Sequence, residues 1–265
     1  FIINIFLIFK IIGYKNASNL GEIIGKKIGP FFRSNTKIEN NLENSNIGNT
    51  KEDRKLIINN MSVNSFFQGI DLIPEMPDIS HISFENIIDL PENVYVNDFE
   101  TNNKFQETSS SFSIGKYNEK RPNMYEGDLF EKTNRFIHMG IDIGAPVGTP
   151  VLSFYDGEIF LFKYNDQKLD YGYTIITKHQ IKGQNIYALY GHLSNSSIKN
   201  KKIGQKIHSG EVLGYLGSEE ENGGWPPHVH FQLSLIKPEE CDLPGVVSKK
   251  NHDIALKIFP DPRIC

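Results

Sequence analysis

The chain has 265 residues and has little of several features that define whole classes of protein. Its two cysteines, Cys241 and Cys265, are too few for a disulfide framework and are not spaced as metal ligands. It has no excess of positive charge: the net charge is −4 and the pI is near 6.1, so there is no electrostatic basis for binding nucleic acid. It also has no HExxH sequence, which disfavours the zinc peptidases that use a glutamate from that motif.

The apolar run at the start of the chain is short. FIINIFLIFKIIG is interrupted by Asn4 and Lys10, whereas a membrane-spanning helix needs about 18 apolar residues. It fits the end of a longer membrane helix, a signal-peptide core, or an apolar helix lying on a membrane or on the domain. Residues 1–55 carry nine Lys/Arg and five Asp/Glu, a net of +4, which favours an anionic membrane surface; a solvated charged helix is an equal alternative. Because the chain begins at Phe1 rather than Met, we interpret it as a fragment or a processed product.

Composition divides the chain into three parts. Residues 1–85 are predicted to be helical, because NLGEIIGKKIGPFF and KEDRKLIINNMSVNSFFQGI place apolar residues at helical spacing. Residues 86–111 lack periodicity and are predicted to be a linker, so deletion of residues 1–105 should leave a folded domain. Over residues 112–265 short β-rich runs alternate with turns, which predicts a mainly β, antiparallel domain. Within it, Asp156-Gly157 predicts a hairpin.

Two predicted strands carry polar residues on one face. Side chains alternate along a strand, so His228 and His230 share one face of HVHFQLSLI, with Gln232 beyond them. In FIHMGIDIG the same alternation puts His138 and Asp142 on one side, and the glycines disfavour a helix. If the two strands meet, these residues form a His₂Asp site of the kind that holds a catalytic zinc ion.

The motifs of this region resemble the zinc metallopeptidases of the LytM/lysostaphin type. The matching sequences, in order, are His138-x-Gly140-x-Asp142, Gly148-Thr149-Pro150-Val151, Tyr190-Gly191-His192-Leu193 and His228-x-His230-Phe231. The resemblance covers roughly residues 112–236. It implies one zinc ion bound by His138, Asp142 and His230, with His192 and His228 beside the metal as non-ligands. It also implies an antiparallel β fold with an open groove over the zinc, and hydrolysis of a peptide bond, typically in peptidoglycan.

The chemistry of hydrolysis gives His192 and His228 their expected role. A group must take the proton of the attacking water and return it to the leaving amine, and imidazole, with an ordinary pKa of about 6.5, can do so at neutral pH. Either histidine could also stabilise the oxyanion, and the sequence leaves their order open. Tyr190 and Trp225 are candidate substrate contacts, although a packed aromatic is an equal alternative for Tyr190.

The loop before the second histidine motif departs from the cell-wall enzymes. In that family it is commonly rich in Gly, Ser and Thr, whereas residues 217–227 here are acidic and contain the only tryptophan. With GKYNEKRPNMYEGDLF and PDPRIC, this form is similar to a subgroup of these domains joined to kinase-like and aminotransferase-like domains, whose substrate the resemblance does not establish. The leading hypothesis is a zinc endopeptidase of peptidoglycan crosslinks. The alternatives are a zinc hydrolase of another peptide or amide, and a non-catalytic binding or regulatory module.

The first 85 residues resemble the opening of lipid A biosynthesis acyltransferases, which are inner-membrane proteins. The matching stretches are GYKNASNLGEIIGKKIGPFF, KIENNLENS and INNMSVNSFFQGIDLIPEMP. That family needs a His-x4-Asp pair, but Asn86 lies five residues after His81 and Ile143 five after His138. We infer no acyltransferase activity and interpret residues 1–85 as an acyltransferase-like remnant, a gene fusion or an assembly error; an unrelated helical, membrane-proximal region is the alternative. A cell-wall substrate favours the cell envelope, in the periplasm or at the inner membrane, and the lack of a complete signal peptide leaves the cytoplasm as the alternative.

Overall fold

The computed structural model describes residues 66–102, 111–122, 124–125 and 134–264. The chain divides into two units, residues 1–58 and 59–265. The helices expected over residues 1–65, the membrane association of residues 1–55 and most of the acyltransferase resemblance lie outside the described residues. All of the described residues belong to the second unit.

This unit is mainly β. Its elements, in order, are β1 (Tyr95–Val96), β2 (Ser113–Gly115), β3 (Glu119–Lys120), β4 (Arg135–His138), β5 (Ile141–Gly144), β6 (Pro150–Leu152), β7 (Gly157–Asn165), β8 (Gly172–Ile181), β9 (Gln184–Leu193), η1 (Asn195–Ser197), β10 (Lys206–Ile207), β11 (Val212–Tyr215), β12 (His228–Ser234), β13 (Val246–Ser248), η2 (Lys249–Asn251), α6 (His252–Ile258) and η3 (Pro262–Ile264). Every strand pairing is antiparallel except that of β1 with β2. The predicted antiparallel β architecture is confirmed for the described part of the chain.

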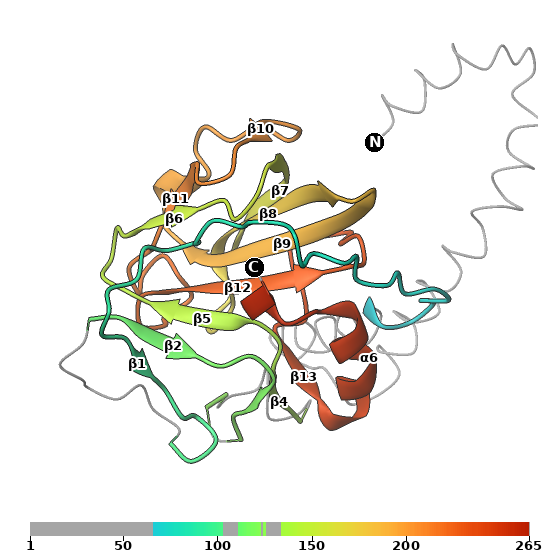
Figure 1. The fold of residues 1–265 in the computed structure, drawn as a ribbon. Coiled ribbons are helices and arrows are strands. Elements are labelled where there is room, and N and C mark those ends of the chain that lie inside the picture. The colour runs from blue at the N-terminus through green and yellow to red at the C-terminus, as the bar shows by residue number, and fades with distance from the viewer. Residues whose placement is uncertain (1–65, 103–110, 123, 126–133, 265) are drawn as a thin grey trace, which may run out of the picture. The chain divides into compact units, whose positions relative to one another are not determined.

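The strand β12 lies inside the largest sheet, between β5 and β9 (Figure 1). The order of that sheet is β1-β2-β5-β12-β9-β8-β7-β10, and the smaller sheets are β11-β6 and β13-β4-β3. The long strands β7, β8 and β9 form consecutive antiparallel pairs because only short turns separate them. An interior strand has neighbours on both sides, so its side chains are held more firmly than those of an edge strand.

Hydrophobic side chains cover both faces of this sheet. Along β9, Ile186, Ala188 and Tyr190 belong to one buried cluster, whereas Tyr187 and Leu189 belong to another. This alternation is what a strand buried on both faces requires. In the β9–β12 pair, Phe231 and Leu233 of β12 lie opposite residues of β9 that belong to the first cluster, and they belong to that cluster themselves. The even-numbered residues of β12 therefore lie on the other face of the sheet, the face of the second cluster.

The segment predicted to be a linker packs into the domain. Ile88 and Phe99 are each 1% exposed, and Ile87 and Ile88 belong to the first hydrophobic cluster. The linker prediction is therefore wrong for residues 86–102, and 103–110 lie outside the described residues. Its apolar residues pack one by one on a sheet that other strands form. Because the segment is irregular, these residues follow no periodic pattern in the sequence.

The prediction of helix also fails for residues 67–85, which form turns and irregular extended structure. Two prolines, Pro74 and Pro77, disfavour a helix there. Met76 and Phe84 pack instead on the first hydrophobic cluster. Figure 1 shows this segment running across the sheet as a long irregular strap.

Two local predictions within the β region also need correction. His138 and Asp142 do not lie on one strand: His138 ends β4, Asp142 belongs to β5 of another sheet, and Met139 and Gly140 separate them. Asp156-Gly157 does not join a hairpin, because β6 pairs with β11 and β7 pairs with β8. In both cases the chain changes sheet at a point where the sequence pattern continues unbroken.

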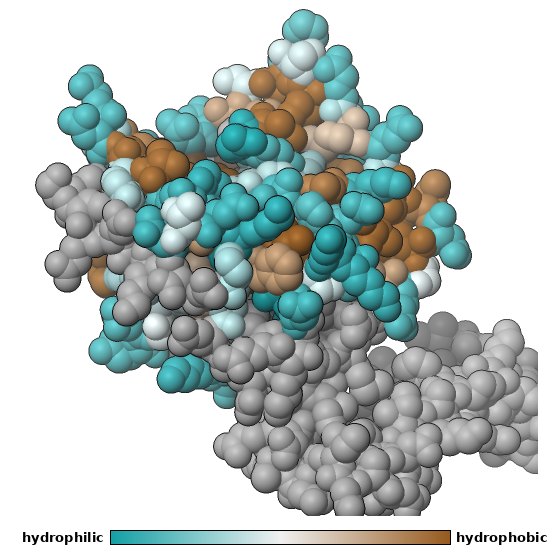
Figure 2. Space-filling model, turned by 90° about the horizontal axis from the view of Figure 1, so that it is seen from below, coloured by the Kyte–Doolittle hydropathy of each residue, from teal (hydrophilic) through white to brown (hydrophobic). Residues whose placement is uncertain are grey.

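On the face shown in Figure 2, hydrophilic and hydrophobic residues are interspersed. Such a mixture is ordinary for the surface of a folded domain. Among the described residues, none of the helices has both the length and the apolar character required to cross a membrane.

Candidate metal and catalytic site

Strand pairing brings the predicted ligands together. In the antiparallel pair β12–β5, His230 lies directly opposite Asp142, and on the other side of β12 it lies opposite Gly191 of β9. His138 reaches the same point from the end of β4. Gly140 leaves room for this approach, since a Cβ atom there would lie 2.6 Å from the His230 ring. The meeting of the two histidine-bearing segments, which the sequence posed as a condition, is confirmed.

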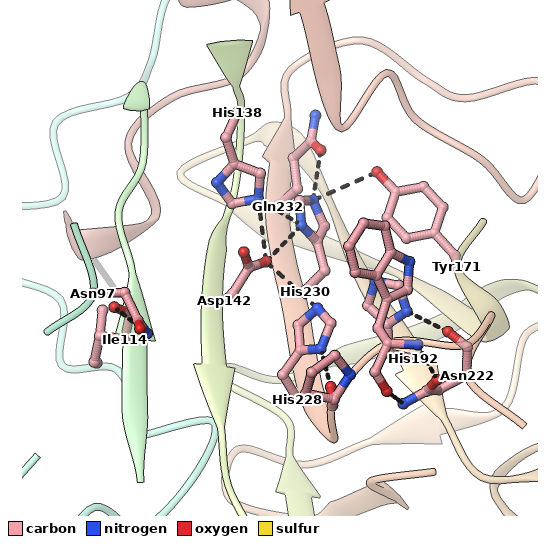
Figure 3. A network of polar contacts seen from close by, with 12 residues as sticks. Asn97, Ile114, His138, Asp142, Tyr171, His192, Asn222, His228, His230 and Gln232 are labelled. Carbon is pink, nitrogen blue, oxygen red and sulfur yellow. Dashed lines mark hydrogen bonds and ion pairs between the residues drawn. The ribbon is translucent and has the colours of Figure 1, made fainter. Parts of the chain in front are cut away.

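Three ligand atoms converge at this point (Figure 3). His138 Nε2 lies 3.0 Å from His230 Nδ1 and 3.1 Å from Asp142 Oδ1. His230 Nδ1 lies 3.0 Å from Asp142 Oδ1. All three residues are buried, with exposures of 2–4%. The cluster has the composition and spacing of a site that could hold a metal ion.

The outer contacts of the two imidazoles fix which nitrogen carries the hydrogen. His138 Nδ1 lies 3.0 Å from the Lys116 carbonyl, which only accepts, so Nδ1–H is the donor. His230 Nε2 lies 3.0 Å from Gln232 Oε1, while the amide nitrogen of Gln232 donates to the Pro244 carbonyl. His230 therefore donates from Nε2. In their neutral forms both rings direct an unprotonated nitrogen at Asp142.

Three acceptors facing one another could hold a cation between them. Desolvation by burial lowers the pKa of His138 to about 4, against the raising effect of Asp142, so His138 is neutral at pH 7. Burial disfavours the charged form of Asp142, but the Arg121 guanidinium beside it holds the pKa of this carboxyl well below its ordinary value. Ligands about 2.0–2.1 Å from a tetrahedral ion would lie about 3.3 Å apart, close to the observed spacing. This donor set fits zinc.

Asp142 is held from behind by a buried arginine. Arg121 Nη1 donates to Asp142 Oδ2 at 2.7 Å, and Arg121 Nε donates to Glu119 Oε2 at 2.9 Å. Asp142 therefore turns one oxygen to Arg121 and the other to the histidines. Arg121 and Glu119 carry no periodic signal in the sequence, and the sequence analysis missed both.

The histidines His192 and His228 lie beside the cluster. Their ring centroids are 4.2 Å apart, and His228 Nε2 lies 3.9 Å from Asp142 Oδ1. Each Nδ1–H donates to a backbone carbonyl at 2.7 Å, that of Asn222 for His192 and that of Pro226 for His228. Desolvation by burial lowers the pKa of both rings, so at neutral pH each has an unprotonated Nε2 able to accept a proton.

His192 has a constrained backbone. Its φ is +63°, a left-handed conformation that is uncommon outside glycine, although histidine adopts it more often than most residues, as asparagine and aspartate do. Such a conformation costs on the order of 1–3 kcal/mol and persists where the surroundings enforce it. Here the His192 N–H donates to the Tyr171 carbonyl and its carbonyl accepts from Gly217 N–H.

The loop of residues 217–227 is organised around Asn222. The Asn222 side chain is fully buried; its oxygen accepts from the N–H groups of Gly224 and Trp225, and its nitrogen donates to the Trp225 carbonyl at 2.8 Å. Trp225 packs edge-on near His192, with ring centroids 6.5 Å apart. Within the acidic run Glu219 and Glu220 are exposed. The structure thus places Trp225 near His192, and its role in substrate contact stays a prediction.

The aromatic residues of the site differ from the sequence-based expectation. Tyr190 is fully buried in the first hydrophobic cluster, on the face of β9 opposite the histidines, and so is a packing residue rather than a groove contact. Tyr171, which the sequence analysis missed, packs between His192 and His230 at centroid distances of 5.5 and 5.1 Å. Its hydroxyl donates to the Leu243 carbonyl. No spacing signal marks Tyr171, because its position depends on the turn before β8.

One further histidine of the same sheet lies in the hydrophobic core. His179 is fully buried; it contacts Thr177 Oγ1 at 2.6 Å and the Asp156 carbonyl at 3.0 Å, and its ring lies against Phe154. These partners satisfy both ring nitrogens without a metal. Burial on a strand therefore does not by itself mark a ligand.

Comparison with known proteins gives a consistent family match. Residues 136–242 match the family described as Peptidase family M23. The DD-carboxypeptidase/endopeptidase Mpg of Neisseria meningitidis is 32% identical over 112 residues, covering 41% of this chain and 23% of that protein. The peptidoglycan DD-endopeptidase ShyC of Vibrio cholerae is 32% identical over 116 residues, covering 42% and 24%. The chain thus spans about a quarter of the length of these relatives.

A solved structure is also similar: the catalytic domain of the prophage-encoded M23 protein EnpA from Enterococcus faecalis, crystallised as a point mutant, at 25% identity and a TM-score of 0.37. That similarity covers 54% of this chain and 92% of EnpA's domain. The family match contains the three converging ligands and both adjacent histidines. Residues 136–242 are accordingly a Peptidase family M23 domain of the LytM type.

Proposed function

We propose that the chain is a zinc-dependent endopeptidase that hydrolyses peptide crosslinks of peptidoglycan in the cell envelope. The observation that carries this proposal is the convergence of His138 Nε2, Asp142 Oδ1 and His230 Nδ1 within 3.0–3.1 Å of one another. With their outer contacts already made, these atoms have no protein hydrogen to share. One zinc ion held there would acidify a water molecule and polarise the scissile carbonyl.

His192 and His228 are the proposed acid–base pair. Because each donates its Nδ1–H to a fixed carbonyl, each ring is held with Nε2 free of hydrogen. His228 Nε2 is 3.9 Å from Asp142 Oδ1, so it lies close to the proposed ligand atoms. The pair takes the proton of the attacking water and returns it to the leaving amine.

Trp225 is the proposed substrate contact. It is half-buried, its indole ring stands edge-on to Tyr125 at a centroid distance of 6.1 Å, and Asn222 fixes its backbone on both sides. A rigid aromatic wall beside the acid–base pair orients a peptide without the entropic cost of ordering a loop. The peptidoglycan assignment is supported by similarity to relatives named as DD-endopeptidases.

Digestion of purified peptidoglycan tests this proposal. Full-length protein loaded with one equivalent of zinc is incubated with sacculi, with defined crosslinked muropeptides and with a panel of unrelated peptides. Mass spectrometry then identifies new amino termini, with His228→Ala as the matched inactive control. We expect crosslinks to be cleaved, chelator to stop cleavage and zinc to restore it. Cleavage restricted to unrelated peptides would contradict the substrate, and binding without cleavage by zinc-loaded protein would contradict the enzymatic assignment.

A further inference from the structure

The buried guanidinium of Arg121 lies outside the family match but contacts a proposed metal ligand. Arg121 follows β3, is 1% exposed and donates to Asp142 Oδ2 at 2.7 Å. Asp142 Oδ1 is the oxygen that faces His138 and His230. A carboxylate free to rotate could offer either oxygen, or both, to a metal. The charge-assisted bond from Arg121 removes that freedom.

We propose that Arg121 is a positioning residue for the metal centre and that the chain upstream of the family match, through Glu119 and Phe99, holds it in place. This inference rests on the proposed metal-dependent function. Arg121 hydrogen-bonds a proposed ligand at Asp142, and its positioning effect on the metal passes through that carboxylate.

Charge balance explains why an arginine is required there. Glu119 and Asp142 flank the guanidinium, and the side chains of Arg121 and Glu119 are only 1% and 3% exposed. A buried ion pair is retained only when its remaining hydrogen-bonding atoms are satisfied. The guanidinium meets this requirement through Tyr125, whose hydroxyl lies 3.2 Å from Arg121 Nη1. Lys116 Nζ lies 3.3 Å from Glu119 Oε1, so Glu119 is also balanced from the surface and the positive charge of Arg121 remains directed at Asp142.

Phe99 connects this ion pair to the segment predicted to be a linker. The Phe99 N–H donates to Glu119 Oε1 at 3.0 Å, and the Arg121 guanidinium carbon lies 4.6 Å from the centre of the Phe99 ring. That distance suits a cation–π contact. Nearby, the Lys116 carbonyl accepts from His138 Nδ1. Two of the three proposed ligands are therefore held from behind, His138 by the Lys116 carbonyl and Asp142 by Arg121.

Metal affinity, measured apart from hydrolysis, tests this inference. Zinc is titrated against a chromophoric chelator in full-length wild type, Arg121→Met, Arg121→Lys and the control Lys120→Met. Lys120 is adjacent and exposed, and its charge pairs only loosely with Glu100 at 4.0 Å. Loss of an outer-shell partner typically weakens metal binding roughly 10–100-fold, so we expect that loss for Arg121→Met, a smaller one for Arg121→Lys and less than about 2-fold for Lys120→Met.

A double-mutant cycle separates positioning from general destabilisation. In an Asp142→Asn background, Arg121→Met should cause little further loss of zinc affinity, because the carboxylate that it positions is gone. A purely structural arginine would weaken zinc binding to the same extent in both backgrounds. That additive result, or unchanged affinity in Arg121→Met, would overturn the inference.

A second variant covers the case in which Arg121→Met does not fold. In wild type the two carboxylate oxygens of Glu119 accept hydrogen bonds from Phe99 and Arg121, and Glu119→Gln keeps only one of these oxygens. We expect zinc affinity to fall by roughly 3–10-fold, which is less than the full loss of an outer-shell partner. Unchanged affinity there would likewise count against the inference. If wild-type protein bound no zinc, the proposed function itself would fail, whereas tight zinc binding in wild type without peptide cleavage would leave the role of Arg121 measurable.

Discussion

Two regions build the site, and they contribute different kinds of group. Residues 136–242, which match the peptidase family, contain the three clustered residues His138, Asp142 and His230 and the adjacent His192 and His228. The flanking segments, residues 66–125 and 243–264, supply groups behind them, such as the buried Arg121. The comparison indicates that the family-matched region supplies the candidate site residues, whereas the upstream flank supports His138 and Asp142 from behind.

The largest expected effect comes from removing the upstream flank. Deleting residues 1–105 removes Ile87, Ile88 and Phe99, whose burial contributes about 1.5–3 kcal/mol each. Because domains are stable by only about 5–15 kcal/mol, we expect this truncation to be unfolded or insoluble. Deleting residues 1–58 should preserve cooperative unfolding, measured by circular dichroism. Equal unfolding midpoints for the two truncations would show that the flank is dispensable, as the linker prediction implied.

Removing a ligand should abolish chemistry while leaving the fold. In His230→Ala we expect zinc content to fall from one equivalent to near zero and hydrolysis to fall below detection, because two donor atoms do not form a closed site. Elemental analysis and the muropeptide assay measure these effects. His179→Ala is the matched control, since His179 is equally buried but satisfied by core partners. Full zinc content in His230→Ala would show that the ligand set is wrong.

The histidines beside the cluster should separate catalysis from binding. His192→Ala and His228→Ala should keep one equivalent of zinc but lose hydrolysis by about 10²-fold or more, the usual contribution of a general acid or base. Zinc content and kcat are measured on the same preparations. Loss of zinc in either variant would place that residue among the ligands, and unchanged turnover in both would point to another base.

The sequence predicts the inward-facing region well because strand alternation is periodic. The alternation in HVHFQLS places His228 and His230 on one polar face, and the structure confirms this. Arg121 has no such signal, since its contact with Asp142 joins residues 21 positions apart across a change of sheet. The burial of Ile87 and Ile88 was not predicted for a related reason. These two apolar residues are buried by contact with a sheet formed elsewhere in the chain, and no local pattern indicates that contact. Tyr190 shows the converse error, because its motif context suggested the groove while its strand parity placed it in the core.

A smaller effect is expected from the loop that carries Trp225. In Asn222→Ala the buried hydrogen bonds to Trp225 and Gly224 are lost, and with them the loop geometry that places the carbonyl accepting from His192. We expect zinc content to be unchanged and kcat/KM to fall by roughly 10-fold, in line with about 1–3 kcal/mol for disrupted buried hydrogen bonds. Steady-state kinetics on a defined muropeptide measure this, with the exposed Glu220→Gln as the control from the same loop. Equal kinetics for both variants would mean that the loop does not organise the site.

An effect of comparable size, on stability rather than activity, distinguishes a core histidine of the family-matched region from the histidines of the site. Desolvation by burial lowers the pKa of His179 to about 4 in the folded protein, whereas the unfolded value is 6.5. The unfolded chain therefore binds more protons between pH 6.5 and 4, so this group's contribution to stability is lost as pH falls through that window. Between pH 7 and pH 5 the loss is about 2 kcal/mol. Urea unfolding at the two pH values should show a pH-dependent loss that is smaller by about this amount in His179→Gln than in wild type. The metal-free protein is used for both, so that ligand protonation is common to them. An identical loss in the two proteins would show that His179 keeps an ordinary pKa in the core. Burial in this sheet would then not lower the pKa of a histidine, which would also contradict the lowered pKa values of His192 and His228.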